Sequence, residues 1–176
     1  MVSFNYKLRS DIRDIDPILL CNSLIDYVIA NEFDSLEKDH MQLISLCAGS
    51  NVELNPLMAE TWLKVYQKLK DYLLVSICDP ELCQEALGVL NNFLTDDHLR
   101  FQVQEETKDV MAKSIELLYN GENEDCKSIF HDYLKKITHS EDNALRKFFR
   151  LVLQKVSEEH SAVFLSSNIA EFKDKL

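Results

Sequence analysis

Few residues in this sequence are spaced for chemistry, and the clearest set is an acid and a histidine three positions apart. Glu37 and His40 lie in a segment of helical character, where this spacing places both side chains on one face. Carboxylate and imidazole ligands at this spacing bind metal ions in helical bundles, but such sites need a second pair and two further carboxylates. The sequence has no second Glu-x-x-His pair. We therefore expect Glu37 and His40 to be solvated surface residues, and a metal-binding helical protein is the weaker alternative.

The cysteines give no clear chemistry either. Cys78, Cys83 and the downstream His98 match no common zinc spacing, and the acidic Asp79 and Glu81 would disfavour a reactive thiolate nearby. An odd number of irregularly spaced cysteines favours reduced and mostly buried thiols over a disulfide framework, and these are Cys21, Cys47, Cys78, Cys83 and Cys126. The sequence also lacks a glycine-rich phosphate loop, a nucleophile elbow and a zinc-protease helix. We predict no catalytic residue and no cofactor.

A short basic cluster is the one charged feature that invites a binding function. Arg146, Lys147 and Arg150 occupy neighbouring positions on a predicted helix, in a chain whose formal net charge is −11. They could form a local cationic patch for an acidic peptide or a phosphate. The other interpretation, which the sequence favours, pairs them with Glu141, Asp142 and nearby acids as ordinary surface ion pairs.

The composition predicts one all-helical domain over residues 1–176, with residues 1–15 as a possible leading arm. Hydrophobic residues make up 46% of the chain, and three glycines and three prolines are too few for a turn-rich β-sandwich. The acidic surface should repel the phosphates of nucleic acid. The sequence has neither the apolar core of a signal peptide nor an apolar run of about 20 residues that could cross a bilayer. We expect an intracellular protein, cytoplasmic or nuclear, with no membrane or nucleic-acid partner.

The three prolines mark expected helix starts. Each follows an acid or amide, at Asp16-Pro17, Asn55-Pro56 and Asp79-Pro80. The polar side chain can cap free backbone N–H groups, and proline at the first helical position loses no hydrogen bond. With the apolar periodicity, these signals predict about eight helices, near residues 16–31, 35–47, 55–76, 79–97, 97–119, 123–138, 141–156 and within 161–176.

The helices show a repeat-like spacing. The starts of alternate helices, at 16, 55, 97 and 140, are 39, 42 and 43 residues apart. Within one unit, the stretch QEALGVLNNFLTDD resembles the final helix of an armadillo repeat, with matching positions at Ala86, Gly88, Leu90, Asn91 and Leu94. The resemblance implies antiparallel helix pairs in a short armadillo- or HEAT-like right-handed stack. The alternative is a closed helical bundle.

A stack of this kind implies a non-enzymatic protein–protein interaction module, such as a scaffold or adaptor. Its groove or an open apolar end would receive a peptide, a helix or a second copy of the chain. Phe4, Tyr6 and Leu8 mark one candidate end, and the other contains Phe164 and Phe172. The predicted partner-binding residues are therefore Arg146, Lys147, Arg150, Phe164 and Phe172. A closed bundle that regulates a partner enzyme by occlusion is the alternative function.

Elemental analysis tests the metal alternative. We expect purified protein to contain iron, manganese and zinc well below one ion per chain, because the sequence supplies only one of the ligand pairs that a dinuclear site needs. A stoichiometric metal that is lost from a Glu37→Ala, His40→Ala variant would contradict this expectation.

Overall fold

The computed structural model describes residues 56–95 and 97–176, together with positions 23, 26, 27, 30, 38, 41, 42 and 44 of the preceding segment. All regular structure within this described part is helical, which confirms the predicted all-α class. The helices at 16–31 and 35–47 and the leading arm at 1–15 lie mostly or wholly outside the described residues. The few positions described there, such as Tyr27 and Met41, are helical.

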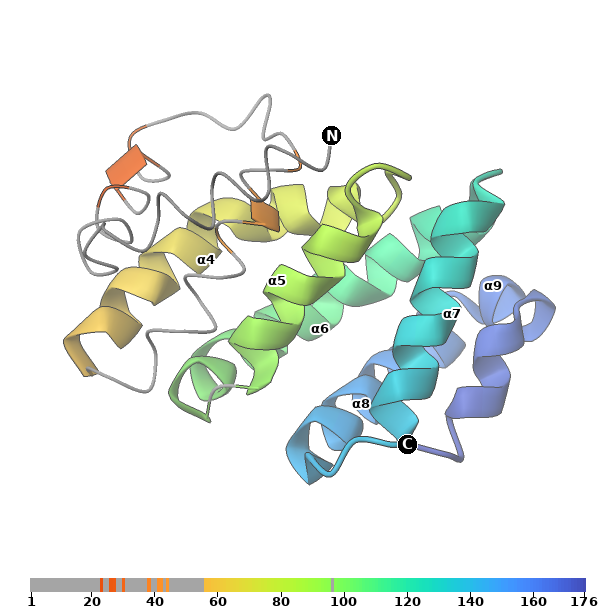
Figure 1. Cartoon of the computed structure of the whole chain (residues 1–176). Helices are drawn as coiled ribbons and strands as arrows, with labels where there is room; N and C mark the ends of the chain where they lie inside the picture. The colour runs from red at the N-terminus through yellow and green to blue at the C-terminus, as the bar shows by residue number, and fades with distance from the viewer. Residues whose placement is uncertain are drawn as a thin grey trace.

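Six α-helices and one 3-10 helix follow one another in the described chain (Figure 1). Their bounds are α4 Pro56–Ser76, α5 Cys83–Thr95, α6 Asp97–Asn120, α7 Glu124–Thr138, α8 Asn143–Glu159, α9 Ser161–Ser166 and η3 Asn168–Phe172. The predicted helices at 55–76, 97–119 and 123–138 match α4, α6 and α7 to within a residue or two. The predicted total of about eight helices stays a prediction.

The other predicted boundaries shift for local reasons. Helix α5 begins at Cys83 rather than at Asp79-Pro80, because Asp79 forms a turn in which its Oδ1 accepts a hydrogen bond from the Glu81 amide at 2.8 Å. Helix α8 begins at Asn143, because Asp142 is its N-cap and accepts bonds from two backbone amides. The predicted last helix is divided at Ser167 into α9 and η3.

The helices form two layers. Helices α4, α6 and α8 lie side by side in one layer, and α5, α7 and η3 follow one another in the second. Consecutive helices run in opposite directions, and α5 and α7 lie in front of the other layer in Figure 1. Alternate helices, rather than consecutive ones, are therefore the neighbours within each layer.

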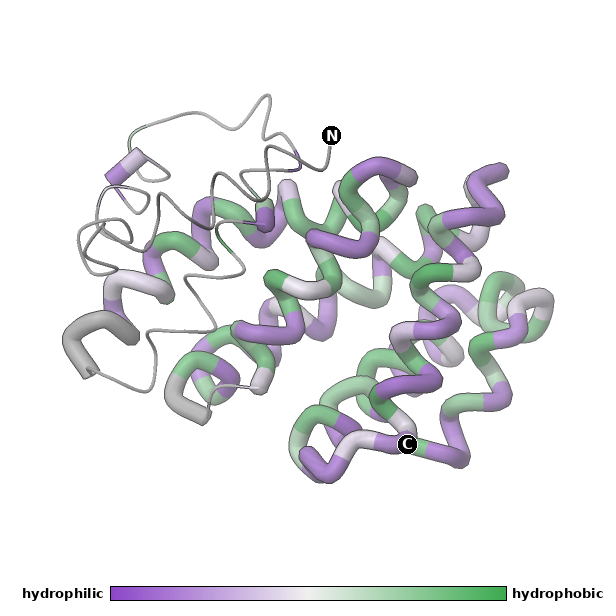
Figure 2. Tube along the Cα trace, in the orientation of Figure 1, coloured by the Kyte–Doolittle hydropathy of each residue, from purple (hydrophilic) through white to green (hydrophobic). Residues whose placement is uncertain are grey.

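A continuous apolar core fills the space between the layers. Hydrophobic residues recur along every helix (Figure 2), and their buried members form one cluster from Met41 to Leu176. Trp62 is only 1% exposed, and its ring lies 6.1 Å from that of Phe93 in an edge-on arrangement. On α8 the buried apolar side chains lie on one face of the helix, and Leu151 is partly exposed outside that face.

The described cysteines are free thiols in or beside this core. Cys83 and Cys126 are buried and Cys78 is half-buried, as expected for reduced thiols, while Cys21 and Cys47 lie outside the described residues. Burial raises the pKa of the Cys83 thiol to about 12. This thiol is therefore protonated and weakly reactive at neutral pH.

A buried polar chain joins α4 to α6. The Tyr66 hydroxyl hydrogen-bonds Thr107 Oγ1, and Thr107 in turn donates to the carbonyl oxygen of Val103 at 2.6 Å. Tyr66 and Thr107 are both fully buried. Burial raises the pKa of Tyr66 to about 12, because the phenolate would lose its solvation.

Replacing Tyr66 by phenylalanine should show how much the hydrogen bond to Thr107 contributes to stability. At pH 7 we expect Tyr66→Phe to lower the free energy of unfolding by about 1–3 kcal/mol, since Thr107 loses a buried partner. Between pH 10 and 12 the unfolded wild-type chain releases the Tyr66 proton and the folded chain retains it, so wild-type stability falls as the pH rises. Urea unfolding across this range should show a shallower fall for the variant, and equal slopes would contradict the assignment.

Candidate functional site

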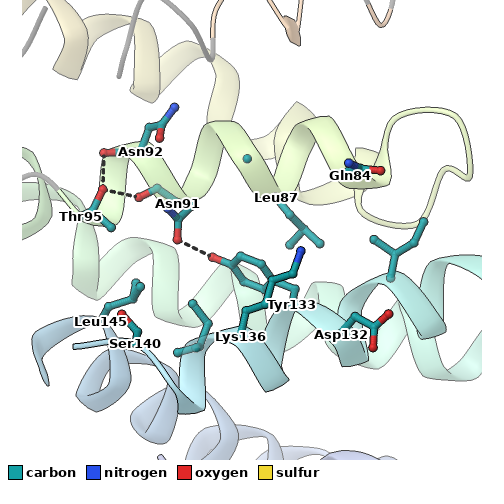
Figure 3. A pocket seen from close by; sticks show the side chains of 13 residues that line it. Gln84, Leu87, Asn91, Asn92, Thr95, Asp132, Tyr133, Lys136, Ser140 and Leu145 are labelled. Atoms are coloured by element: carbon teal, nitrogen blue, oxygen red, sulfur yellow. Dashed lines mark hydrogen bonds between the residues drawn. The ribbon is translucent and has the colours of Figure 1, made fainter. Parts of the chain in front are cut away.

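A groove between α5 and α7 is the first candidate site, with a volume of about 620 Å³ (Figure 3). Residues from the two facing helices line it, and the α7–α8 connection closes one end. From α5 these are Gln84, Leu87, Gly88, Asn91, Asn92 and Thr95; the others are Ile129, Asp132, Tyr133, Lys136, Ile137, Ser140 and Leu145.

One stripe of α5 supplies the polar wall of the groove. Gln84, Gly88, Asn91 and Thr95 follow one another at three- and four-residue steps, so a regular helix brings them to the same face. Side-chain amides carry both donors and an acceptor, and they can pair with the N–H and C=O groups of a peptide backbone. Gly88 adds no side chain, which leaves room between the amides above and below it.

Tyr133 forms the opposite wall and is tied to α5. Its hydroxyl donates a hydrogen bond to Asn91 Oδ1 at 3.3 Å (Figure 3), and its ring lies edge-on to Phe149 of α8 at 5.5 Å. Burial raises the pKa of the Tyr133 phenol, so the hydroxyl keeps its proton at neutral pH. Since its single O–H proton is already donated to Asn91, the residue can offer a ligand only an acceptor oxygen, and it is not a base.

The rim of the groove carries one charge of each sign, at Asp132 and Lys136, while Leu87 and Ile137 give it an apolar floor. This lining suits a neutral, partly apolar chain. No three His, Cys, Asp or Glu side chains in the described part of the chain are placed to share a metal ion. Glu37 and His40 lie outside that part.

Of the suggested zinc set of Cys78, Cys83 and His98, the structure describes the two cysteine side chains. Cys78 Sγ lies 3.9 Å from the Ser114 carbonyl oxygen and Cys83 Sγ lies 3.9 Å from that of Cys126, so each thiol faces a backbone acceptor. The His98 side chain lies outside the described residues.

The predicted basic cluster lines a second hollow, of about 490 Å³. Its lining residues are Asn143, Arg146, Lys147, Arg150, Leu151, Lys175 and Leu176, and we call it the basic pocket. The expected pairing with Asp142 is absent, because that carboxylate bonds Arg100 of α6 at 3.2 Å. Arg146 instead bonds the side-chain oxygen of Asn143.

Phe164 and Phe172 lie inside the fold rather than on an open end face. Both are buried, and the Phe172 ring meets His131 edge-on at 4.9 Å. The exposed apolar side chain in this region is Leu165, at 80%. The sequence suggested otherwise because it does not show that η3 folds back against α7 and covers these rings. The other predicted end, at Phe4, Tyr6 and Leu8, lies outside the described residues.

Comparisons with family models, curated proteins and solved structures found no match for this chain. Among the described helices, none is both long and apolar enough to cross a membrane. The candidate sites for a function are therefore the α5–α7 groove and the basic pocket.

Sequence reasoning found only half of the groove. It singled out Gly88 and Asn91 on α5 but none of Asp132, Tyr133 and Lys136 on α7. The only signal for the second wall was the repeat-like spacing, since Tyr133 follows Asn91 by 42 positions.

A double-mutant cycle tests the contact across the groove. We expect Asn91→Ala and Tyr133→Phe to be coupled by about 0.5–1.5 kcal/mol in the free energy of unfolding, because either change removes the same hydrogen bond. Chemical denaturation of both single variants and the double variant measures this coupling. Asn91→Ala with Tyr119→Phe is the matched control and should be additive, and additivity in the first cycle would refute the contact.

Proposed function

We propose that the protein is a non-enzymatic protein–protein interaction module, a scaffold or adaptor whose α5–α7 groove receives a peptide segment of a partner. The observation that carries this proposal is the groove itself, lined by amides and a protonated phenol over an apolar floor. Such a lining matches a peptide backbone with apolar side chains.

We further propose that the fold is a short armadillo- or HEAT-like stack. Its support is the regular sequence separation of contacts between neighbouring helices of one layer. Hydrogen bonds join Gln67 to Glu106, Arg100 to Asp142, Asn91 to Tyr133 and His131 to Glu171, at separations of 39, 42, 42 and 40 residues. Helix-pair repeats have periods of about 40–47 residues.

The dimensions of the groove limit the ligand. Helix α5 has 13 residues and is about 20 Å long at 1.5 Å per residue. An extended peptide rises about 3.3 Å per residue, so about six residues fit along this wall. We therefore expect short extended peptides with a low net charge and one or two apolar side chains.

Filling the groove should abolish this binding. Peptides of about six residues are first selected from a displayed library for binding to the wild-type chain. Their affinities for the wild type are then compared with those for the double variant Gln84→Trp with Lys136→Trp. Both positions are exposed on the groove walls, so the indoles should occupy the peptide's space without disturbing the core. We expect at least about a tenfold weaker affinity, which corresponds to the loss of about 1.4 kcal/mol of binding free energy.

The matched control places the same two indoles at Lys64 and Lys113, which are exposed on α4 and α6 and do not line the groove. This variant should bind the selected peptides as the wild type does. Equal binding by the groove-filled variant, or the selection of no peptide at all, would contradict the proposed function.

A further inference from the structure

The basic pocket concentrates positive charge in a chain whose formal net charge is −11. Arg146, Lys147 and Arg150 enter it from the first two turns of α8, and Lys175 enters it from the segment after η3. Four cationic side chains thus converge on one hollow from two parts of the chain.

The charge of this pocket is only partly neutralised within the protein. Lys147 and Arg150 are exposed, and neither forms an ion pair with any residue that the structure describes. Lys175 pairs with Glu171 at 2.8 Å. Arg146 bonds the neutral Asn143, and its buried Nε has no hydrogen-bond partner. The pocket therefore offers unused donors and an uncompensated positive charge.

The start of α8 provides no acidic side chain that could neutralise these cations. The amino end of a helix carries a partial positive charge, which favours acids and disfavours Lys and Arg in the first turn. Helix α8 has no acid in its first turn, and the carboxylate of its cap, Asp142, is already paired with Arg100. The start of α8 therefore supplies no carboxylate to the cations of the pocket, and these side chains remain available to an anion.

The surroundings of the pocket favour a short acidic peptide over a larger polyanion. Exposed charges act over only about 8 Å at physiological ionic strength, so a peptide inside the pocket mainly senses the local cations. A bilayer or a nucleic acid would extend over the acidic remainder of the surface. Leu151, which is 39% exposed, also lines the pocket and can contact an apolar side chain of the peptide.

We propose that the basic pocket binds an acidic segment of a protein partner, whose carboxylates pair with Lys147 and Arg150. This inference does not depend on the α5–α7 groove being occupied. Leu145, immediately before Arg146, lines the end of that groove, so a single partner could reach both hollows.

Charge reversal in the full chain tests the proposal. The probe is a fluorescein-labelled peptide, Leu-Glu-Glu-Leu-Glu-Glu, and the measurement is fluorescence anisotropy at physiological ionic strength. We expect Lys147→Glu with Arg150→Glu to weaken binding by about tenfold or more, because two attractive pairs become repulsive. Lys64→Glu with Lys113→Glu changes the net charge equally at exposed positions outside the pocket and should weaken it less than about twofold.

Further measurements distinguish an acidic peptide from other ligands of the basic pocket. The glutamine analogue of the peptide should not bind, and the groove-filling pair Gln84→Trp with Lys136→Trp should leave binding unchanged, so failure of the groove proposal would not mimic failure here. The proposal is overturned if wild type does not bind the acidic peptide, or if both charge-reversal pairs weaken binding equally. It is also overturned if phosphatidylserine vesicles bind in the peptide's place with the same dependence on Lys147 and Arg150.

Discussion

The packing of α6 between α4 and α8 is the constraint on which the rest of the described fold depends. Helix α6 contacts the helices on both sides of its layer and also α5 of the second layer, so its apolar residues must face several directions. Polar contacts at its two edges align α6 with the neighbouring helices. Thr107 hydrogen-bonds the Tyr66 hydroxyl of α4, and Arg100 pairs with Asp142, the N-cap of α8. Once these helices are aligned, α5 and α7 are brought together in the second layer.

The groove follows from what α5 presents to α7. The core side of α5 is closely filled by Ala86, Phe93 and other apolar residues, whereas the side toward α7 carries Gly88 and asparagines. Small and polar side chains leave space where larger apolar ones would close the contact. Tyr133 bridges this space through Asn91 and limits how far the two helices can separate. One helix thus contributes both to the core and to the groove for which peptide binding is proposed.

The electrostatics of α8 connect the fold to the second hollow. Asp142 caps the helix and also bonds Arg100, so one carboxylate serves both the end of α8 and its contact with α6 in the same layer. Because that acid is engaged, Lys147 and Arg150 face the basic pocket without a partner among the described residues. The same long-range ion pair that holds α8 against α6 therefore leaves the pocket positively charged.

The sequence by itself determined the helices, because caps and apolar periodicity act between residues a few positions apart. Asn123 caps the start of α7 and Gly121 follows the end of α6, close to the predicted bounds of these helices. Only the tertiary structure decided which helices meet. It placed Tyr133 beside Asn91, the Phe172 ring against His131, and Asp142 against Arg100. Each of these contacts joins residues about 40 positions apart. Such pairings depend on how whole apolar faces fit together, and local patterns do not specify that fit.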